Sequence, residues 1–208
     1  MIIAVDGPLA SGKGTIARAL AARFGLPYLD TGSLYRATGV AVLEQGIDPC
    51  DEAACAAAAR ALDITAIDEA RIRTAEAGAM ASRIAVLTGV RTALYELQRN
   101  FALQPGGAIL DGRDIGTVIC PDADVKLYIM ADTETRARRR WEELTARGEA
   151  ISYAEMLEQT RERDRRDAER PDAPMRAADD ATLLDTSSLS IDAAVAQAVA
   201  VVEKRQKA

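Results

Sequence analysis

Apolar residues are spaced in two ways along this chain, and the two spacings alternate. The run Ile2–Val5 is apolar and mostly β-branched, which is typical of a strand buried on both faces of a sheet. Residues 16–24 instead place apolar side chains at helical spacing, and the pattern ends at Gly25. A buried strand followed by a helix is the repeating unit of α/β proteins, so we predict an α/β fold.

The same alternation continues through most of the chain. Four further apolar runs predict strands at residues 27–30, 108–111, 125–130 and 182–185. Helical spacing predicts helices at residues 34–45, 51–62, 75–87, 90–101 and 191–204, one through Arg136 that ends near Gly148, and one from Ser152 toward Pro171. We expect helix caps at Thr74, Ser152 and Ser190 and a helix break at Gly89.

Residues 47–89 interrupt this alternation. They are rich in alanine and predict helices, apart from a short β-like run at residues 64–67. We expect an insertion there, on top of the sheet of a single domain whose core is residues 1–46, 90–140 and 175–208. Residues 141–174 combine many arginines with glycine and proline breaks, which predicts a mobile lid.

The segment between the first strand and the first helix carries the strongest chemical signal. Its glycines let backbone N–H groups approach phosphate oxygens, and the following helix directs its positive end at the anion. Lys13 adds a positive charge for the β- and γ-phosphates of a nucleotide. Gly14 stands where the usual motif has a hydroxyl residue, so Thr15 could contact either a metal or only a phosphate. The expected phosphate-binding residues are Gly7, Pro8, Leu9, Ala10, Ser11, Gly12, Lys13, Gly14 and Thr15.

Polar residues also follow two other predicted strands. The carboxyl ends of parallel strands line the ligand crevice, so we expect Thr31 and Arg36 there, and likewise Asp111, Arg113 and Asp114. Thr31 could instead cap a helix, and Arg36 could be an ordinary surface charge. An acid at a strand end, here Asp111, is typical of a Mg²⁺ site in phosphate-loop proteins, direct or through water.

One predicted helix near the lid is rich in arginine. Arg163, Asp167 and Arg170 are spaced i, i+4 and i+7, so they share one face. Mixed charges at this spacing usually form a solvated surface, whereas a lid would turn such a face toward phosphates.

Composition excludes several classes of function. The 208 residues include no histidine, which rules out Ser-His-Asp and Cys-His catalysis and histidine-bound metals. The three cysteines cannot make a four-ligand zinc site, and we interpret them as small buried residues of a reducing compartment. A net charge of −6 argues against a nucleic-acid partner, and no apolar run reaches the length of a membrane span. We expect a cytoplasmic monomer.

Four segments together resemble the bacterial cytidylate kinases: residues 7–15, 29–36, 111–117 and 163–167. Many families share the phosphate loop, but the Gly112–Thr117 loop and the arginine helix are far more specific. The resemblance covers nearly the whole chain. It implies a five-stranded parallel sheet in the order 2-3-1-4-5, and transfer of a phosphoryl group from ATP to CMP or dCMP with Mg²⁺.

The resemblance also implies roles for individual residues by matching position. Catalysis would involve Lys13, Arg113 and Arg163. The acceptor phosphate would be held by Arg36, Arg113 and Arg163, and the sugar hydroxyls by Asp167. The residues around the cytosine would be Thr31, Ser82, Arg91, Asp114 and Arg170. The stretch 63–80 is shorter than the insertion of the family, which usually includes a small antiparallel sheet.

The missing histidine agrees with this chemistry. The attacking phosphate oxygen is already largely ionised at neutral pH, so alignment and charge neutralisation suffice. Two other functions stay open at this point. One is a kinase of another small acceptor, such as a different nucleoside monophosphate or dephospho-coenzyme A. The other is a nucleotide-binding switch, although the guanine-reading N-K-x-D motif is absent because the only asparagine, Asn100, precedes Phe101.

Overall fold

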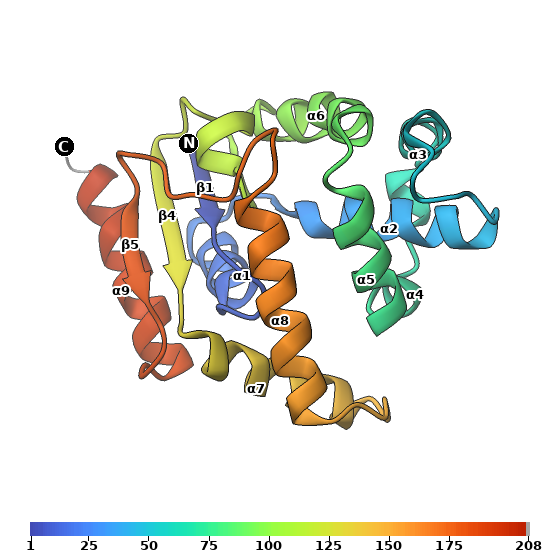
Figure 1. Cartoon of the computed structure of the whole chain (residues 1–208). Coiled ribbons are helices and arrows are strands. Elements are labelled where there is room, and N and C mark those ends of the chain that lie inside the picture. The colour runs from blue at the N-terminus through green and yellow to red at the C-terminus, as the bar shows by residue number, and fades with distance from the viewer. Residues whose placement is uncertain (207–208) are drawn as a thin grey trace.

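The computed structural model describes residues 1–206 and shows a five-stranded parallel sheet (Figure 1). The order across the sheet is β2-β3-β1-β4-β5, which confirms the predicted order and fold class. Both edge strands are short, and β1 lies in the centre, so its carboxyl end meets those of β3 and β4. The strands are β1 (Ile2–Asp6), β2 (Tyr28–Asp30), β3 (Ala108–Gly112), β4 (Val125–Met130) and β5 (Thr182–Asp185).

Helices cover both faces of this sheet. On one face, Ile3 and Val5 of β1 pack against α1 (Lys13–Phe24) and α9 (Ile191–Gln206). On the other face, Ala4 belongs to a second apolar cluster with α6 (Thr88–Ala102) and a π-helical turn, η2 (Ile115–Ile119). β1 is therefore buried on both sides, as its unbroken apolar run predicts.

The insertion is entirely helical over its described residues. It contains α3 (Glu52–Arg60), a short 3₁₀ turn at Ile64–Ala66, α4 (Glu69–Ile72) and α5 (Ala75–Ile84), and it packs on α2 (Thr31–Glu44) around a third apolar cluster. The β-like run predicted at residues 64–67 is wrong. A turn bond from the Ala66 amide to the Asp63 carbonyl closes this segment, and no neighbouring strand is available there to pair with it.

Two helix ends differ from what the sequence suggested. The alternative role of Thr31 as a helix cap is not seen, because α2 begins at Thr31 itself and its hydroxyl donates to the carbonyl oxygen of Asp111 at 2.7 Å. Gly89 does not break a helix, because the break lies at residues 85–87 and Gly89 sits in the first turn of α6. The caps at Thr74, Ser152 and Ser190 are confirmed by bonds from following backbone amides.

Two helices follow β4. They are α7 (Thr133–Ala146) and α8 (Tyr153–Ala168), which lie side by side beside the carboxyl edge of the sheet (Figure 1). The predicted lid, residues 141–174, contains the end of α7 and the whole of α8. Arg136 on α7 joins them through a two-pronged ion pair with Asp164 on α8, at 2.6 and 3.0 Å. No helix within residues 1–206 combines the length and apolar character needed to cross a membrane.

Candidate active site

The phosphate loop is fixed by its own backbone and by neighbouring strands. Gly7 adopts a φ of 150°, and a Cβ there would lie 2.0 Å from the carbonyl oxygen of Ile129, so only glycine fits. Gly12 adopts a φ of 91° directly before α1, which lets the chain turn into the helix. The carbonyl of Ser11 accepts a hydrogen bond from the Thr186 hydroxyl at 2.8 Å. The loop is therefore shaped before any ligand binds.

Two adjoining cavities meet at the carboxyl edge of the sheet. The loop cavity is lined by the loop residues from Leu9 to Thr15 except Ser11, with Arg36, Asp111 and Arg163. The central cavity shares Lys13, Arg36, Asp111 and Arg163 with it. All predicted acceptor-site residues except Arg91 line the central cavity, which gathers Thr31, Arg36, Ser82, Arg113, Asp114, Arg163, Asp167 and Arg170. The charged face of α8 is thus turned inward rather than into solvent.

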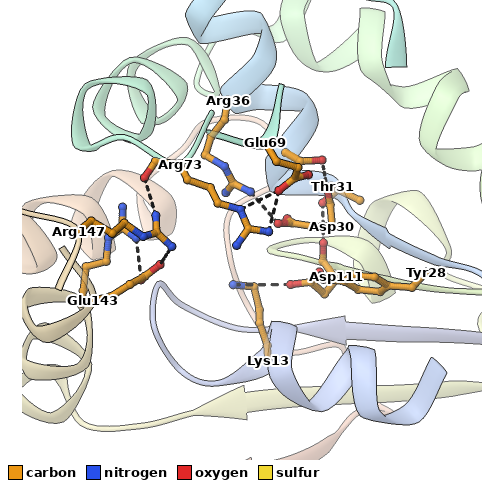
Figure 2. Close-up of polar contacts among 12 residues, drawn as sticks. Lys13, Tyr28, Asp30, Thr31, Arg36, Glu69, Arg73, Asp111, Glu143 and Arg147 are labelled. Atoms are coloured by element: carbon orange, nitrogen blue, oxygen red, sulfur yellow. Dashed lines mark hydrogen bonds and ion pairs between the residues drawn. The ribbon is translucent and has the colours of Figure 1, made fainter. Parts of the chain in front are cut away.

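Lys13 and Asp111 face each other where the two cavities meet, as Figure 2 shows. Lys13 Nζ lies 4.0 Å from Asp111 Oδ2, while the Tyr28 hydroxyl donates to Asp111 Oδ1 at 2.7 Å. Burial, then the charge of Arg113, lower the pKa of Lys13 to about 7. Burial, then the charge of Asp30, raise the pKa of Asp111 to about 6. An anion near Lys13 or a cation near Asp111 would restore each charge.

Arg36 and Arg113 are held by carboxylates in this structure. Arg36 Nη2 donates to Asp30 Oδ2 at 2.6 Å (Figure 2). Arg113 Nε donates to Asp167 Oδ2 at 2.8 Å, and its Nη1 donates to the carbonyl of Gly7 at 2.8 Å. Burial is the largest single effect on Asp167 and would raise its pKa, but the charges of Arg113, Arg163 and Arg170 and the hydrogen bond from Arg113 together hold this pKa below its usual value. These pairs keep both guanidinium groups at the cavity wall.

Arg163 is a partly buried cation that lines both cavities. Burial, then the charge of Arg113, lower its pKa to about 10. Its Nε is buried without a hydrogen-bond partner among the described residues. A guanidinium with an unpartnered donor at a cavity shared with the phosphate loop indicates an anionic ligand.

Asp114 is the centre of a second ion-pair group deeper in the central cavity. Arg91 Nη2 donates to its Oδ2 at 2.5 Å, and Arg170 lies 3.9 Å from its Oδ1. Arg91 is buried beside Asp114 without lining the cavity, and its Nη1 has no partner within residues 1–206. Ser82 Oγ is likewise buried and unpartnered in that range. Such orphaned polar atoms indicate an occupant that offers hydrogen-bonding groups.

The oxygen ligands available for a metal fit Mg²⁺. This ion usually takes one or two carboxylates, several waters and the phosphates of a nucleotide. Asp111 and Thr15 both line the loop cavity, and Tyr28 occupies only one of the two Asp111 oxygens. Over the described part of the chain, no group of three or more histidine, cysteine or acidic residues is placed so that it could hold a metal ion.

The sequence analysis missed several residues that shape this site. Asp6 ends β1, and its carboxylate accepts hydrogen bonds from the Ile115 and Gly116 amides, each at 2.8 Å. It thereby ties the turn that carries Arg113 and Asp114 to the strand before the phosphate loop. The strand-end rule that selected Asp111 would also have selected Asp6. No sequence pattern of this kind marks Tyr28, Asp30 or Arg73, because only the folded chain brings them to the site.

The fold and the site define the class of the protein. A parallel sheet in this order, flanked by helices and with a phosphate loop after the central strand, is the arrangement of the phosphate-loop kinases. Solved structures share the fold: a gluconokinase from Sinorhizobium meliloti has a TM-score of 0.53 at 13% identity, covering 99% of this chain and 93% of that one. A sugar kinase from Janibacter sp. has a TM-score of 0.53 at 14% identity, with 97% and 94% covered.

Sequence similarity then gives the family. The family model described as cytidylate kinase matches residues 3–204, and the chain belongs to this family. A cytidylate kinase of Xanthobacter autotrophicus is 58% identical over 206 residues, which is 99% of each chain. A cytidylate kinase of Cereibacter sphaeroides is 57% identical over 204 residues, covering 98% of this chain and 96% of that one.

Proposed function

We propose that this chain is a cytoplasmic, monomeric kinase that transfers the γ-phosphoryl group of ATP to CMP or dCMP, giving ADP and CDP or dCDP. Family membership supports the reaction. The structural observation that best supports this reaction is the junction of the two cavities, where Lys13, Arg36 and Arg163 lie beside the phosphate loop. A donor phosphate on one side and an acceptor phosphate on the other would meet there.

On the donor side, the loop amides and Lys13 bind the ATP phosphates. Asp111 and Thr15 would hold Mg²⁺, directly or through water, and the ion supplies neutralisation of the phosphate charge. The adenine would enter a mainly apolar groove that starts at the loop and continues toward α9. This groove is lined by Gly12, Thr15, Ile16, Arg139, Thr186, Leu189, Ser190, Ile191 and Ala194.

On the acceptor side, Arg36, Arg113 and Arg163 bind the phosphate of CMP. Arg36 and Arg113 are now paired with Asp30 and Asp167, so the ligand phosphate would take over part of the role of these carboxylates. The freed Asp167 carboxylate can then accept hydrogen bonds from the sugar hydroxyls. The acceptor phosphate needs no general base, because its oxygen is already largely ionised.

The base would be read by Asp114 and its neighbours. Cytosine offers an amine donor beside a ring-nitrogen acceptor, and uracil reverses both. An ionised Asp114 can only accept, and Arg91 can only donate. Arg91 holds Asp114 through Nη2 and does not line the cavity in this structure, so the base would have to come within reach of its unpartnered Nη1 for Arg91 to donate to the ring nitrogen. Thr31, Ser82 and Arg170 complete the polar wall around the base.

A coupled assay of ADP release with CMP, dCMP, UMP and AMP tests this proposal. We expect fast release with CMP and dCMP, and a strong preference over UMP, because buried polar pairing can discriminate by up to about 10⁴–10⁵. Equal rates with UMP would contradict base reading. Slow release that no acceptor stimulates would instead indicate a nucleotide-binding switch.

A further inference from the structure

The loop cavity contains a cation that has no role in the site as described so far. Arg73 comes from the insertion and lines this cavity together with Lys13 and Arg36. Figure 2 shows its guanidinium directed toward the space between the ends of these two side chains, on the side of the cavity opposite α1. It therefore approaches the loop from the insertion, whereas Lys13 approaches from the loop itself.

The backbone around Arg73 fixes the direction of this side chain. Arg73 is the residue that follows α4, and Thr74 caps the start of α5, so the chain turns a corner at these two positions. Ile72, the preceding residue, is buried and anchors the corner in the insertion. The corner leaves Arg73 facing the cavity.

Two residues of the predicted lid bond the backbone at this corner, at Arg73 and Ala75. Arg147 Nη1 donates to the carbonyl oxygen of Arg73 at 2.9 Å (Figure 2), and Glu149 Oε1 accepts from the Ala75 amide at 3.3 Å. Both lid residues lie just after α7. The position of Arg73 is thus tied to contact between the lid and the insertion.

The guanidinium of Arg73 has a partner that a phosphate can replace. Arg73 Nε donates to Glu69 Oε2 at 2.7 Å, within a pair spaced i, i+4 along α4. The side chains of Arg73 and Glu69 are 51% and 63% exposed, so solvent screens this pair and holds it weakly. A phosphate oxygen bound at the loop would compete well for the planar guanidinium donors.

We propose that Arg73 is a further catalytic residue, which contacts the phosphoryl group while it passes between donor and acceptor. The inference rests on the proposed function. In that step an oxygen of the CMP phosphate bonds to the γ-phosphorus, the bond from this phosphorus to the β–γ bridging oxygen breaks, and ADP leaves with that electron pair. Arg73 exchanges no proton or covalent bond; it stabilises the charge that spreads over the moving group. Arg147 acts as a positioning residue through the Arg73 carbonyl.

Arg71 provides a matched control two residues away. It is an arginine within α4, its side chain is 58% exposed, and it pairs with Glu44 rather than lining the loop cavity. The test compares Arg73→Ala, Arg73→Lys, Arg71→Ala, Glu69→Ala and Arg147→Ala with the unmodified protein. For each protein one measures kcat and KM for ATP and CMP, equilibrium ATP binding, and thermal unfolding.

We expect Arg73→Ala to lower kcat by about 10²-fold, the usual effect of removing one preorganised charge. KM values and ATP affinity should change by no more than about threefold, because the contact is made mainly in the transition state. Arg73→Lys should recover part of kcat, and Arg71→Ala and Glu69→Ala should match the unmodified protein. Arg147→Ala should lower kcat less than Arg73→Ala, with unchanged thermal unfolding.

Two results would overturn the inference. One is a kcat for folded Arg73→Ala equal to that of Arg71→Ala. The other is an equal loss in Arg73→Ala and Glu69→Ala, which would mark the pair as a structural support of α4. If Arg73→Ala does not fold, Arg73→Gln takes its place, and a full kcat in this uncharged variant would overturn the inference. An unmodified protein without acceptor-dependent ADP release would instead refute the proposed function.

Discussion

The donor and acceptor sides of this site are built in different ways. The phosphate loop is one continuous segment, and its shape comes from backbone conformation at Gly7 and Gly12 and from support by β4 and Thr186. The acceptor side is assembled from side chains on α2, α5, α6, α8 and the turn after β3. Its charges are held mainly by one another, as in the pairs Arg113–Asp167 and Arg91–Asp114.

This difference determines what each ligand must do. In the proposed site, ATP would bind to amides that are already in place, so its phosphates would need few rearrangements of the loop. CMP would have to replace carboxylates that now hold the arginines, as for Arg36 with Asp30. Substitutions on the donor side should therefore act on the rate with little effect on the fold. Substitutions on the acceptor side should act on selectivity.

Lys13→Met gives the largest expected effect and tests the donor side. Transfer should fall by about 10²–10³ in kcat or more, because Lys13 supplies positive charge to the transition state. The variant should still fold, because backbone conformation shapes the loop. Burial already disfavours the charged form of Lys13 and lowers its pKa to about 7, so the fold does not depend on this charge. Steady-state kinetics measure kcat, and thermal unfolding measures whether the variant is folded. Substantial turnover in the folded variant would remove Lys13 from the mechanism.

Asp6→Asn tests the junction between the two sides. Burial raises the pKa of Asp6 from 3.8 to about 7, although the Gly116 and Ile115 amides oppose the shift. Between these values the folded protein binds a proton that the unfolded chain has released. The free energy of unfolding should therefore fall as pH rises from about 4 to 7, by at most about 1.4 kcal/mol per unit and by about 3 kcal/mol in total, because the slope is smaller near both pKa values.

The asparagine variant should lose most of this slope, because its amide does not titrate. Denaturant unfolding from pH 4 to 8 measures the slope in both proteins. A smaller decline should persist in the variant, since burial also raises the pKa of Asp111 to about 6. Parallel curves for the two proteins would show that Asp6 does not titrate in this window.

Asp114→Asn tests the acceptor side. An amide can present either a donor or an acceptor, so discrimination between cytosine and uracil should weaken. We expect kcat/KM for CMP to drop by about 1–3 kcal/mol in transition-state binding, and for UMP to drop less or rise. An unchanged ratio of the two efficiencies would leave Asp114 as a structural partner of Arg91.

The sequence predicted best what depends on neighbouring residues. The strands at 125–130 and 182–185 have the predicted bounds, and the capping box at Ser152 is present, because each depends on a short local pattern. The phosphate loop was found for the same reason. The residues matched by resemblance gather at one cavity, with Arg91 behind its wall, although their roles there still await experiment.

The failures come from contacts between distant segments. Residues 64–67 look like a strand, yet a strand requires a partner that only the whole fold can supply. Thr31 resembles a helix cap, but its hydroxyl bonds a residue eighty positions away. The hydrogen bond from Tyr28 to Asp111 likewise depends on the pairing of β2 with β3. Arg73 lines the loop cavity only because the insertion packs close to the phosphate loop. A local sequence pattern does not indicate which distant segments will come into contact in the fold.

Thr186→Val gives the smallest expected effect and examines how firmly the loop holds its own shape. Thr186 lies after β5, and its hydroxyl donates to the buried end of the loop at the Ser11 carbonyl. Valine has nearly the same shape but cannot donate, so the free energy of unfolding should fall by about 1 kcal/mol. If the glycines set the loop geometry, kcat should change by less than about twofold. Denaturant unfolding and steady-state kinetics on one preparation measure both quantities. A large loss of kcat with intact stability would show that the loop depends on this side chain, and the donor side would then resemble the acceptor side more closely than its backbone suggests.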